Sequence, residues 1–232
     1  MSTAIPSFEE RCRNNQHPIP SNATSRLLWY IQGPSLTDNV FVLSDSSDPA
    51  GPSQLYALEP TDSKPRWHDI SREPVTTPAV SSVTVQSREL QGHPDWWASE
   101  THRHADPDFD FCVYGDEHEN GTRKLLQCCG EDRPHEHVPL LVKASTQPFV
   151  TIHDYISAVH PWIFSLREGI LAASLNPPDD GSKLVINYND ISSVKISSEE
   201  RWTLMTRDFF AENPPYNPPD NPPSIWHTMF TG

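Results

Sequence analysis

Two pairs of histidines are the side chains of this sequence best suited to chemistry. The pairs are His102 with His104 and His135 with His137, and a single residue separates the members of each pair. Alternate residues of an extended strand share a face, so both imidazoles of a pair would point the same way. Neutral imidazoles placed like this bind Zn, Fe, Cu or Ni, and Asp108 follows His104 closely enough to add a carboxylate. We therefore predict acid–base or metal-assisted catalysis by His102, His104 and Asp108.

The spacing His102-x-His104-x-x-x-Asp108-x6-Gly115 resembles the first metal motif of the cupin family. The resemblance implies a small β-barrel that binds one divalent metal ion through His102, His104, Asp108 and His137. The chain departs from the family's pattern in three ways. Asp stands where the family has Glu, the glycine expected just before the motif is absent, and no second metal motif is recognisable.

Charged neighbours give the same histidines a simpler interpretation. Both pairs lie in segments rich in Asp, Glu and Arg, residues 100–108 and 131–137. In a solvated loop, imidazoles pair loosely with nearby carboxylates and need no metal ion. The sequence leaves both interpretations open, and we give more weight to the solvated loop.

His160 is a further candidate catalytic residue. It immediately precedes Pro161, a residue that favours the first position of a helix. An imidazole at a helix N-terminus has a lowered pKa and stays neutral, as a general base requires. The alternative, which we favour, is a core histidine bonded to a nearby carbonyl group.

Tryptophans could wall a ligand cavity near the histidines. Trp96 and Trp97 precede the first histidine pair, and Trp67, Trp162 and Trp202 lie elsewhere in the chain. Binding sites for organic molecules are mostly apolar with a few placed polar groups, so these rings could enclose a largely apolar ligand. They could equally serve as scaffold.

The composition excludes several classes of protein. The chain has 232 residues, with 17 Lys and Arg against 31 Asp and Glu, so its formal net charge is −14. Nucleic acids and anionic lipids are bound by clustered cations, so we expect neither nucleic acid nor membrane as a partner. Only 9 glycines are present and no Gly-rich phosphate loop, which argues against nucleotide cofactors. With no signal peptide or membrane span in the sequence, we predict a cytoplasmic protein.

The cysteines predict no disulfide framework. The four cysteines, Cys12, Cys112, Cys128 and Cys129, are few and unevenly spaced. On a strand, the adjacent residues Cys128 and Cys129 would point to opposite faces. We therefore expect reduced thiols.

Short apolar runs between turn residues predict strands in the first two thirds of the chain. These runs are residues 26–32, 39–43, 54–58, 80–85, 109–114, 123–129 and 138–143. We expect one hairpin from 26–32 and 39–43, and a second from 109–114 and 123–129. Pro139 confines the last strand to a sheet edge or a strand start.

From Thr151 onward the apolar spacing becomes helical. Thr151 and Asp154 form a capping signature, and apolar residues follow at intervals of three and four as far as Leu171. Pro161 lies inside this pattern and predicts either a kink or a second helix that begins there.

The end of the chain adds a strand and another helix. Residues 183–188 predict a strand, and Ser197 with Glu200 predicts the cap of a last helix. We therefore expect an α+β fold. It has a mostly antiparallel sheet or a partly open β-barrel in the first two thirds, and two to three helices with one strand in the last third.

The chain divides into three expected parts. Residues 1–25 predict a flexible arm, residues 26–211 a single α+β domain, and residues 212–232 a Pro-rich tail with three Asn-Pro-Pro repeats. The stretch from Val150 to Trp162, with the strand at 183–188 after it, resembles uncharacterised intracellular proteins of filamentous fungi. That resemblance implies no activity.

Two functions of different classes follow from these patterns. The first is binding of a small, largely apolar organic molecule, with cyclase, isomerase or hydrolyase chemistry and no organic cofactor. Clustered His and Asp side chains would then act on the ligand, with or without a divalent metal. The alternative is a non-catalytic interaction module that contacts a protein partner through residues 212–232 and a helical face.

Overall fold

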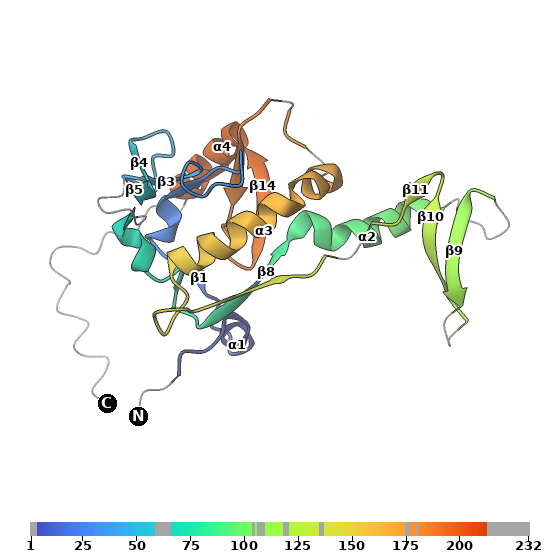
Figure 1. Ribbon diagram of the computed structural model, residues 1–232, viewed down its shortest axis with the longest axis horizontal. Helices are drawn as coiled ribbons and strands as arrows, with labels where there is room; N and C mark the ends of the chain where they lie inside the picture. Colours follow the sequence, from blue (N-terminus) through green and yellow to red (C-terminus); the bar gives the residue numbers. More distant parts are fainter. Residues whose placement is uncertain are drawn as a thin grey trace.

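The computed structural model describes residues 4–58, 66–103, 105, 110–117, 121–134, 137–174, 177–179 and 181–212 (Figure 1). Of residues 208–212 it describes the backbone alone. The fold is α+β with mostly antiparallel sheets, as predicted. The helices are α1 Phe8–Arg13, α2 Arg88–Thr101, α3 Ile152–Ala173 and α4 Glu199–Glu212. Among these helices, none combines the length and the apolar character that a membrane span requires.

A four-stranded sheet covered by α3 forms the centre of the fold. Its strands, in spatial order, are β12 Leu140–Lys143, β8 Ser82–Ser87, β14 Ser193–Ser198 and β13 Leu184–Asn187. β12 pairs antiparallel with β8, and β13 pairs antiparallel with β14, whereas β8 and β14 run parallel. Helix α3 contacts β12, β8 and β14 and lies across them in Figure 1. The main core lies between this helix and the sheet.

The side-chain pattern of β8 explains its place in this sheet. Val83 and Val85 are fully buried, and the alternate residues Ser82, Thr84 and Gln86 are half-buried, so the expected alternation is confirmed. Pro139 directly precedes β12, and β12 is an edge strand, also as expected.

A three-stranded sheet extends the core at the N-terminal side. It consists of β2 Leu27–Trp29, β3 Val40–Leu43 and β4 Ser53–Leu55, paired antiparallel in the order β2–β3–β4. The predicted hairpin of residues 26–32 and 39–43 is therefore confirmed. A bridge between Tyr30 and Val185 joins this sheet to β13.

Two further pairs of very short strands complete the first third. Both pairs are antiparallel: β1 Ile19–Pro20 with β7 Thr76–Thr77, and β5 Ala57–Leu58 with β6 Arg66–Trp67. The strands of the whole fold are distributed over five separate sheets, and none of these sheets closes into a barrel. Within the described residues, the closed β-barrel implied by the cupin resemblance is therefore not formed.

Helix α3 begins at the capping signature found in the sequence. The Thr151 hydroxyl accepts a hydrogen bond from the Asp154 backbone N–H at 3.0 Å, and Asp154 Oδ2 accepts one from the Thr151 backbone N–H at 2.9 Å. Pro161 does not divide the helix, which is continuous from Ile152 to Ala173. Because Val159 and Ile163 are both fully buried on either side of Pro161, core packing favours one helix over two.

Helix α2 was not predicted from the sequence. Gly92 and Pro94 lie inside it, and both residues disfavour a helix interior. Its buried residues are nevertheless spaced as a helical face, at Leu90, Pro94, Trp97 and Thr101. This stripe, placed directly after β8, is the signal that could have revealed the helix.

A small sheet projects from the far end of α2 (Figure 1). It consists of β9 Cys112–Glu117, β10 Arg123–Cys128 and β11 Glu131–Asp132, all antiparallel, in the order β11–β10–β9. The predicted hairpin of residues 109–114 and 123–129 is confirmed.

The last third contains two strands, where one was expected. β14 was missed because Ser and Lys alternate with its two buried residues, Val194 and Ile196. The predicted last helix is confirmed as α4, but its first turn is capped one residue later than expected. Here the Ser198 hydroxyl, instead of that of Ser197, accepts from the Arg201 N–H at 3.3 Å.

The first 25 residues make specific contacts where the structure describes them. The Thr84 N–H donates to Glu9 Oε1 at 2.8 Å, and Arg11 Nε donates to the Ala79 carbonyl at 2.9 Å. These bonds attach α1 to β8 and the segment before it. The division into arm, domain and tail stays a prediction, and residues 213–232 lie outside the described residues.

Candidate ligand cavity at the ends of two parallel strands

The chain forms a cavity where β8 and β14 pass into their helices. β8 leads directly into α2 and β14 directly into α4, and because these strands are parallel both helices leave the same edge of the sheet. Ser87, the last residue of β8, lies opposite Val194, so α2 begins alongside the second half of β14. The cavity between them has a volume of about 560 Å³, and the chain that follows α3 lines it as well. This volume is typical of sites for small organic ligands.

Three basic side chains from separate elements line this cavity. Arg88 is the first residue of α2, Lys195 belongs to β14, and Arg201 lies in the first turn of α4. Within the described part of the chain, none of the three has an ion-pair or hydrogen-bond partner for its side chain. Cations without such partners are suited to receive an anionic group of a ligand.

An indole and an imidazole form an aromatic wall beside these cations. Trp96 lines the cavity and is 50% exposed. The His93 ring, one helical turn earlier, stacks on it with ring centroids 6.1 Å apart and planes 22° apart. A half-exposed indole next to a cavity offers a flat apolar surface to a ring of a ligand.

Carboxylates complete the lining of the cavity. Glu89, Asp179 and Glu200 line it, and Glu89 Oε2 accepts a hydrogen bond from the Ser87 hydroxyl at 3.2 Å. No ion pair within 4.0 Å joins them to the three cations. The cavity thus offers its basic side chains to an anionic group of a ligand and its carboxylates to hydrogen-bond donors of the same ligand.

Gly92 leaves space at the cavity wall. It lies on α2 between Glu89 and Trp96, and a Cβ atom placed there would meet no atom within 4 Å. A side chain at this position would therefore extend into the open space without disturbing the fold.

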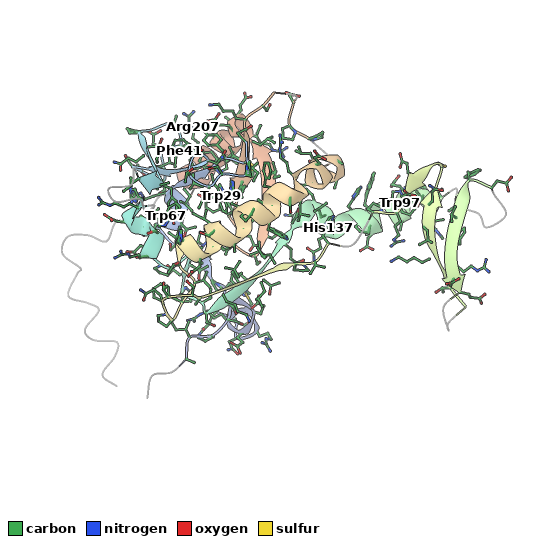
Figure 2. All side chains as sticks on the ribbon, viewed as in Figure 1. Trp29, Phe41, Trp67, Trp97, His137 and Arg207 are labelled. Atoms are coloured by element: carbon green, nitrogen blue, oxygen red, sulfur yellow. The ribbon has the colours of Figure 1, made fainter. Side chains whose placement is uncertain are left out.

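The predicted histidine and aspartate site lies apart from this cavity where it can be placed. His102 is the C-terminal cap residue of α2 and is exposed, and His137 is exposed in the segment before β12 (Figure 2). Neither lines the cavity. His104, Asp108 and His135 lie outside the described residues. Among the residues that the structure describes, no group of three or more His, Cys, Asp or Glu side chains is arranged to hold a metal ion.

His160 is a buried histidine in the middle of α3. The Trp29 Nε1–H donates to Nδ1 of His160 at 2.9 Å, and Nε2 donates to the Gly33 carbonyl at 3.0 Å. Burial lowers the pKa of His160, partly opposed by the bond to Gly33. This is the core histidine bonded to a carbonyl that we favoured, and a helix N-terminus is not the cause of its low pKa. Both ring nitrogens are occupied, which leaves none for a substrate.

The tryptophans that the structure describes do not converge on one cavity. Figure 2 shows Trp29 near the middle of the fold, with Trp67 and Trp97 on opposite sides of it. Trp67 contacts Tyr56 and His153, with ring centroids 5.5 Å and 4.7 Å away. Trp162 and Trp202 also pack as scaffold: Trp162 lies against the main core, and Trp202 belongs to a second apolar cluster.

The sequence analysis missed most residues of the cavity because they come from distant segments. Arg88 and Lys195 are brought together by the parallel pairing of β8 and β14, and no sequence motif marks that pairing. Of the cavity side chains described above, Trp96 is the one that the sequence indicated as a ligand contact. No family model, no curated protein and no solved structure matches this chain.

Proposed function

We propose that this protein binds a small organic carboxylate with an aromatic or other flat apolar part, in the cavity between α2 and α4. One observation carries the proposal: Arg88, Lys195 and Arg201 line one cavity, next to the half-exposed ring of Trp96, and their side chains have no partner among the residues that the structure describes. The ligand expected from the sequence was largely apolar. The cations of the cavity add an anionic group to that expectation.

The proposed binding mode assigns a role to each side of the cavity. The carboxylate of the ligand pairs with Arg201 and Lys195, neither of which forms an ion pair with a described residue. The flat part of the ligand lies against Trp96. Donor groups of the ligand face Glu89 and Glu200.

The experiment is a thermal-shift titration of the full chain with benzoate and cinnamate, each compared with its uncharged amide. A ligand at about 100 times its Kd stabilises the folded state by about 2.7 kcal/mol, so a saturable rise of the Tm with the acids alone is expected. No saturable rise with either acid, or an equal rise with the amides, would contradict the proposal.

Two variants with matched controls locate the site. Arg201→Gln is expected to remove the response to the acids, whereas Arg207→Gln, on the same helix but outside the cavity lining, keeps it. Gly92→Leu is expected to occupy the part of the cavity beside Trp96 and to weaken binding. Its control is Gln91→Leu at the neighbouring exposed position, which does not line the cavity.

Catalysis by His102, His104 and Asp108, with or without a divalent metal bound also by His137, remains a separate proposal. Metal analysis of protein purified without a histidine tag tests the metal-dependent version. Stoichiometric Zn, Fe, Mn, Cu or Ni that is lost in His102→Ala would support it. Protein without bound metal would leave acid–base chemistry alone.

The interaction module is the second candidate function. Leu204 and Met205 on α4 are 55% and 43% exposed, and α4 leads directly into residues 213–232. Apolar side chains exposed this close to a Pro-rich tail favour a partner at that surface. Deletion of residues 214–232 should then abolish capture of a partner and leave the Tm unchanged. A large fall in the Tm would mean that the tail stabilises the fold.

A further inference from the structure

Three of the four cysteines meet in the projecting sheet. Cys112 of β9 lies directly opposite Cys128 of β10, and their Sγ atoms are 3.6 Å apart. The Sγ atom of Cys129 lies 3.8 Å from that of Cys128. The remaining cysteine, Cys12, is on α1. The expectation that Cys128 and Cys129 point to opposite faces holds for two residues of a strand and does not apply here, because Cys129 lies beyond the end of β10, with φ +53°.

The three thiols differ in their access to solvent. Cys112 is half-buried, Cys129 is exposed, and Cys128 is buried. Burial raises the pKa of the Cys128 thiol, and its hydrogen bonds with Cys112 and Cys129, the second of which Cys128 donates, raise it further. A small oxidant in solution therefore reaches Cys112 more readily than Cys128.

We propose that Cys112 and Cys128 are a redox-active pair that hydrogen peroxide converts to a reversible disulfide. The Cys112 thiolate attacks one peroxide oxygen and the O–O bond breaks, which gives a Cys112 sulfenic acid and one water molecule. The Cys128 sulfur then attacks the Cys112 sulfur, the S–O bond breaks, and the hydroxide leaves as water with the Cys128 proton. Two thiols are oxidised to one disulfide, and one peroxide is reduced to two waters.

The geometry favours this pair over Cys128 with Cys129. Residues directly opposite in an antiparallel pair have Cβ atoms about 4.5–5.5 Å apart, and a disulfide needs about 3.5–4.5 Å, so a small movement of the strands closes the bond. A disulfide between adjacent residues closes a small ring that distorts the peptide bond between them. The Cys112–Cys128 bond would join β9 to β10 at one end of the hairpin and leave the main core, which contains neither residue, unchanged.

The test uses the full chain, reduced, freed of reductant under nitrogen and treated with hydrogen peroxide. Remaining thiols are blocked with N-ethylmaleimide, and non-reduced tryptic peptides are identified by mass spectrometry. We expect the number of blockable thiols to fall from four to two. The peptide with Cys112 should be joined to the peptide with Cys128, and dithiothreitol should reverse the link.

Serine variants distinguish the cysteines. Cys129→Ser should form the same cross-link at an undiminished rate, whereas Cys112→Ser should form none between these peptides. Circular dichroism of each variant confirms that it is folded. A bond to Cys12, a bond that is lost in Cys129→Ser, sulfinic acid without a cross-link, or four thiols that stay blockable would each overturn the proposal. None of these outcomes bears on ligand binding in the cavity, so the two proposals fail separately.

Discussion

Trp29 and His160, which are 131 positions apart in the sequence, are joined by a hydrogen bond of 2.9 Å in the core. Their rings also stack, with centroids 6.1 Å apart and planes 16° apart. Because His160 in turn donates to the Gly33 carbonyl, one imidazole connects β2, the loop after it and α3. The histidine is a structural link between the N-terminal sheet and the long helix.

Replacing His160 with Leu is expected to destabilise the protein by roughly 2–4 kcal/mol, because the Trp29 indole N–H and the Gly33 carbonyl both lose a buried partner. Urea denaturation measures the change. The double variant with Trp29→Phe should cost less than the sum of the single variants, since both remove the same bond. His102→Ala, at an exposed site, is the control, and a His160→Leu effect as small as this control would refute the role of the link.

Stability should fall when the pH drops below 6.5, the ordinary histidine pKa. Burial lowers the pKa of His160, of His153 and of His68, so the unfolded chain binds these protons before the folded chain does. The stabilisation by the neutral histidines is complete above pH 6.5, and it is lost as the pH falls from 6.5 through the lowered pKa values of the folded state. For His160 the cause is visible, since Nδ1 already accepts the Trp29 N–H and cannot also hold a proton.

The measurement is the free energy of unfolding in urea at about pH 7 and about pH 5, a range in which most carboxylates stay ionised. His160→Leu should show a smaller decrease than the wild-type chain. Equal decreases in the two proteins would assign the effect to other groups.

Local sequence patterns predicted the elements whose formation depends mainly on their own residues. The Thr151–Asp154 cap and the apolar spacing after it predicted α3, and the alternation around Val83 predicted β8. Helix α2 escaped prediction because Gly92 and Pro94 weaken its local preference, while burial of Trp97 and its neighbours stabilises it. Tertiary packing, which no local pattern reports, decides that segment.

The candidate site was harder to predict than the fold for the same reason. The histidine pairs could be recognised in the sequence because only one residue separates the members of each pair. The cavity depends on the parallel contact of Gln86 and Ser87 with Ser193 and Val194, more than a hundred positions away. Single charged residues such as Arg88 and Lys195 carry no signal until that contact places them on one wall.

Gly92 and Gly181 should respond in opposite directions to substitution by alanine. A Cβ atom meets nothing within 4 Å at either position, but Gly92 is helical and Gly181 has φ +87°. Gly92→Ala should therefore stabilise the protein by about 0.5–1 kcal/mol through helix propensity. Gly181→Ala should destabilise it, because its backbone conformation is strained for any residue with a Cβ atom. Thermal unfolding followed by circular dichroism measures both, and a destabilising Gly92→Ala would show that the space beside α2 is filled.

Thr151→Ala is expected to cost about 1–2 kcal/mol of stability. The hydroxyl accepts from the Asp154 N–H and donates to Asp154 Oδ2, at 3.0 Å and 2.8 Å, and it lies at the start of the helix that covers the central sheet. Thr151→Ser keeps both bonds and should retain most of the stability, as measured by urea denaturation.

The equivalent change at Ser7, which caps α1 with the same box, should cost less. Helix α1 has six residues and buries none of them, so its cap supports little packing. If Thr151→Ala and Thr151→Ser were equally destabilising, the loss would come from the packing of the buried side chain and not from the cap. The comparison thus separates a hydrogen-bonded helix start from simple burial, because Ser keeps the hydroxyl and lacks the methyl group.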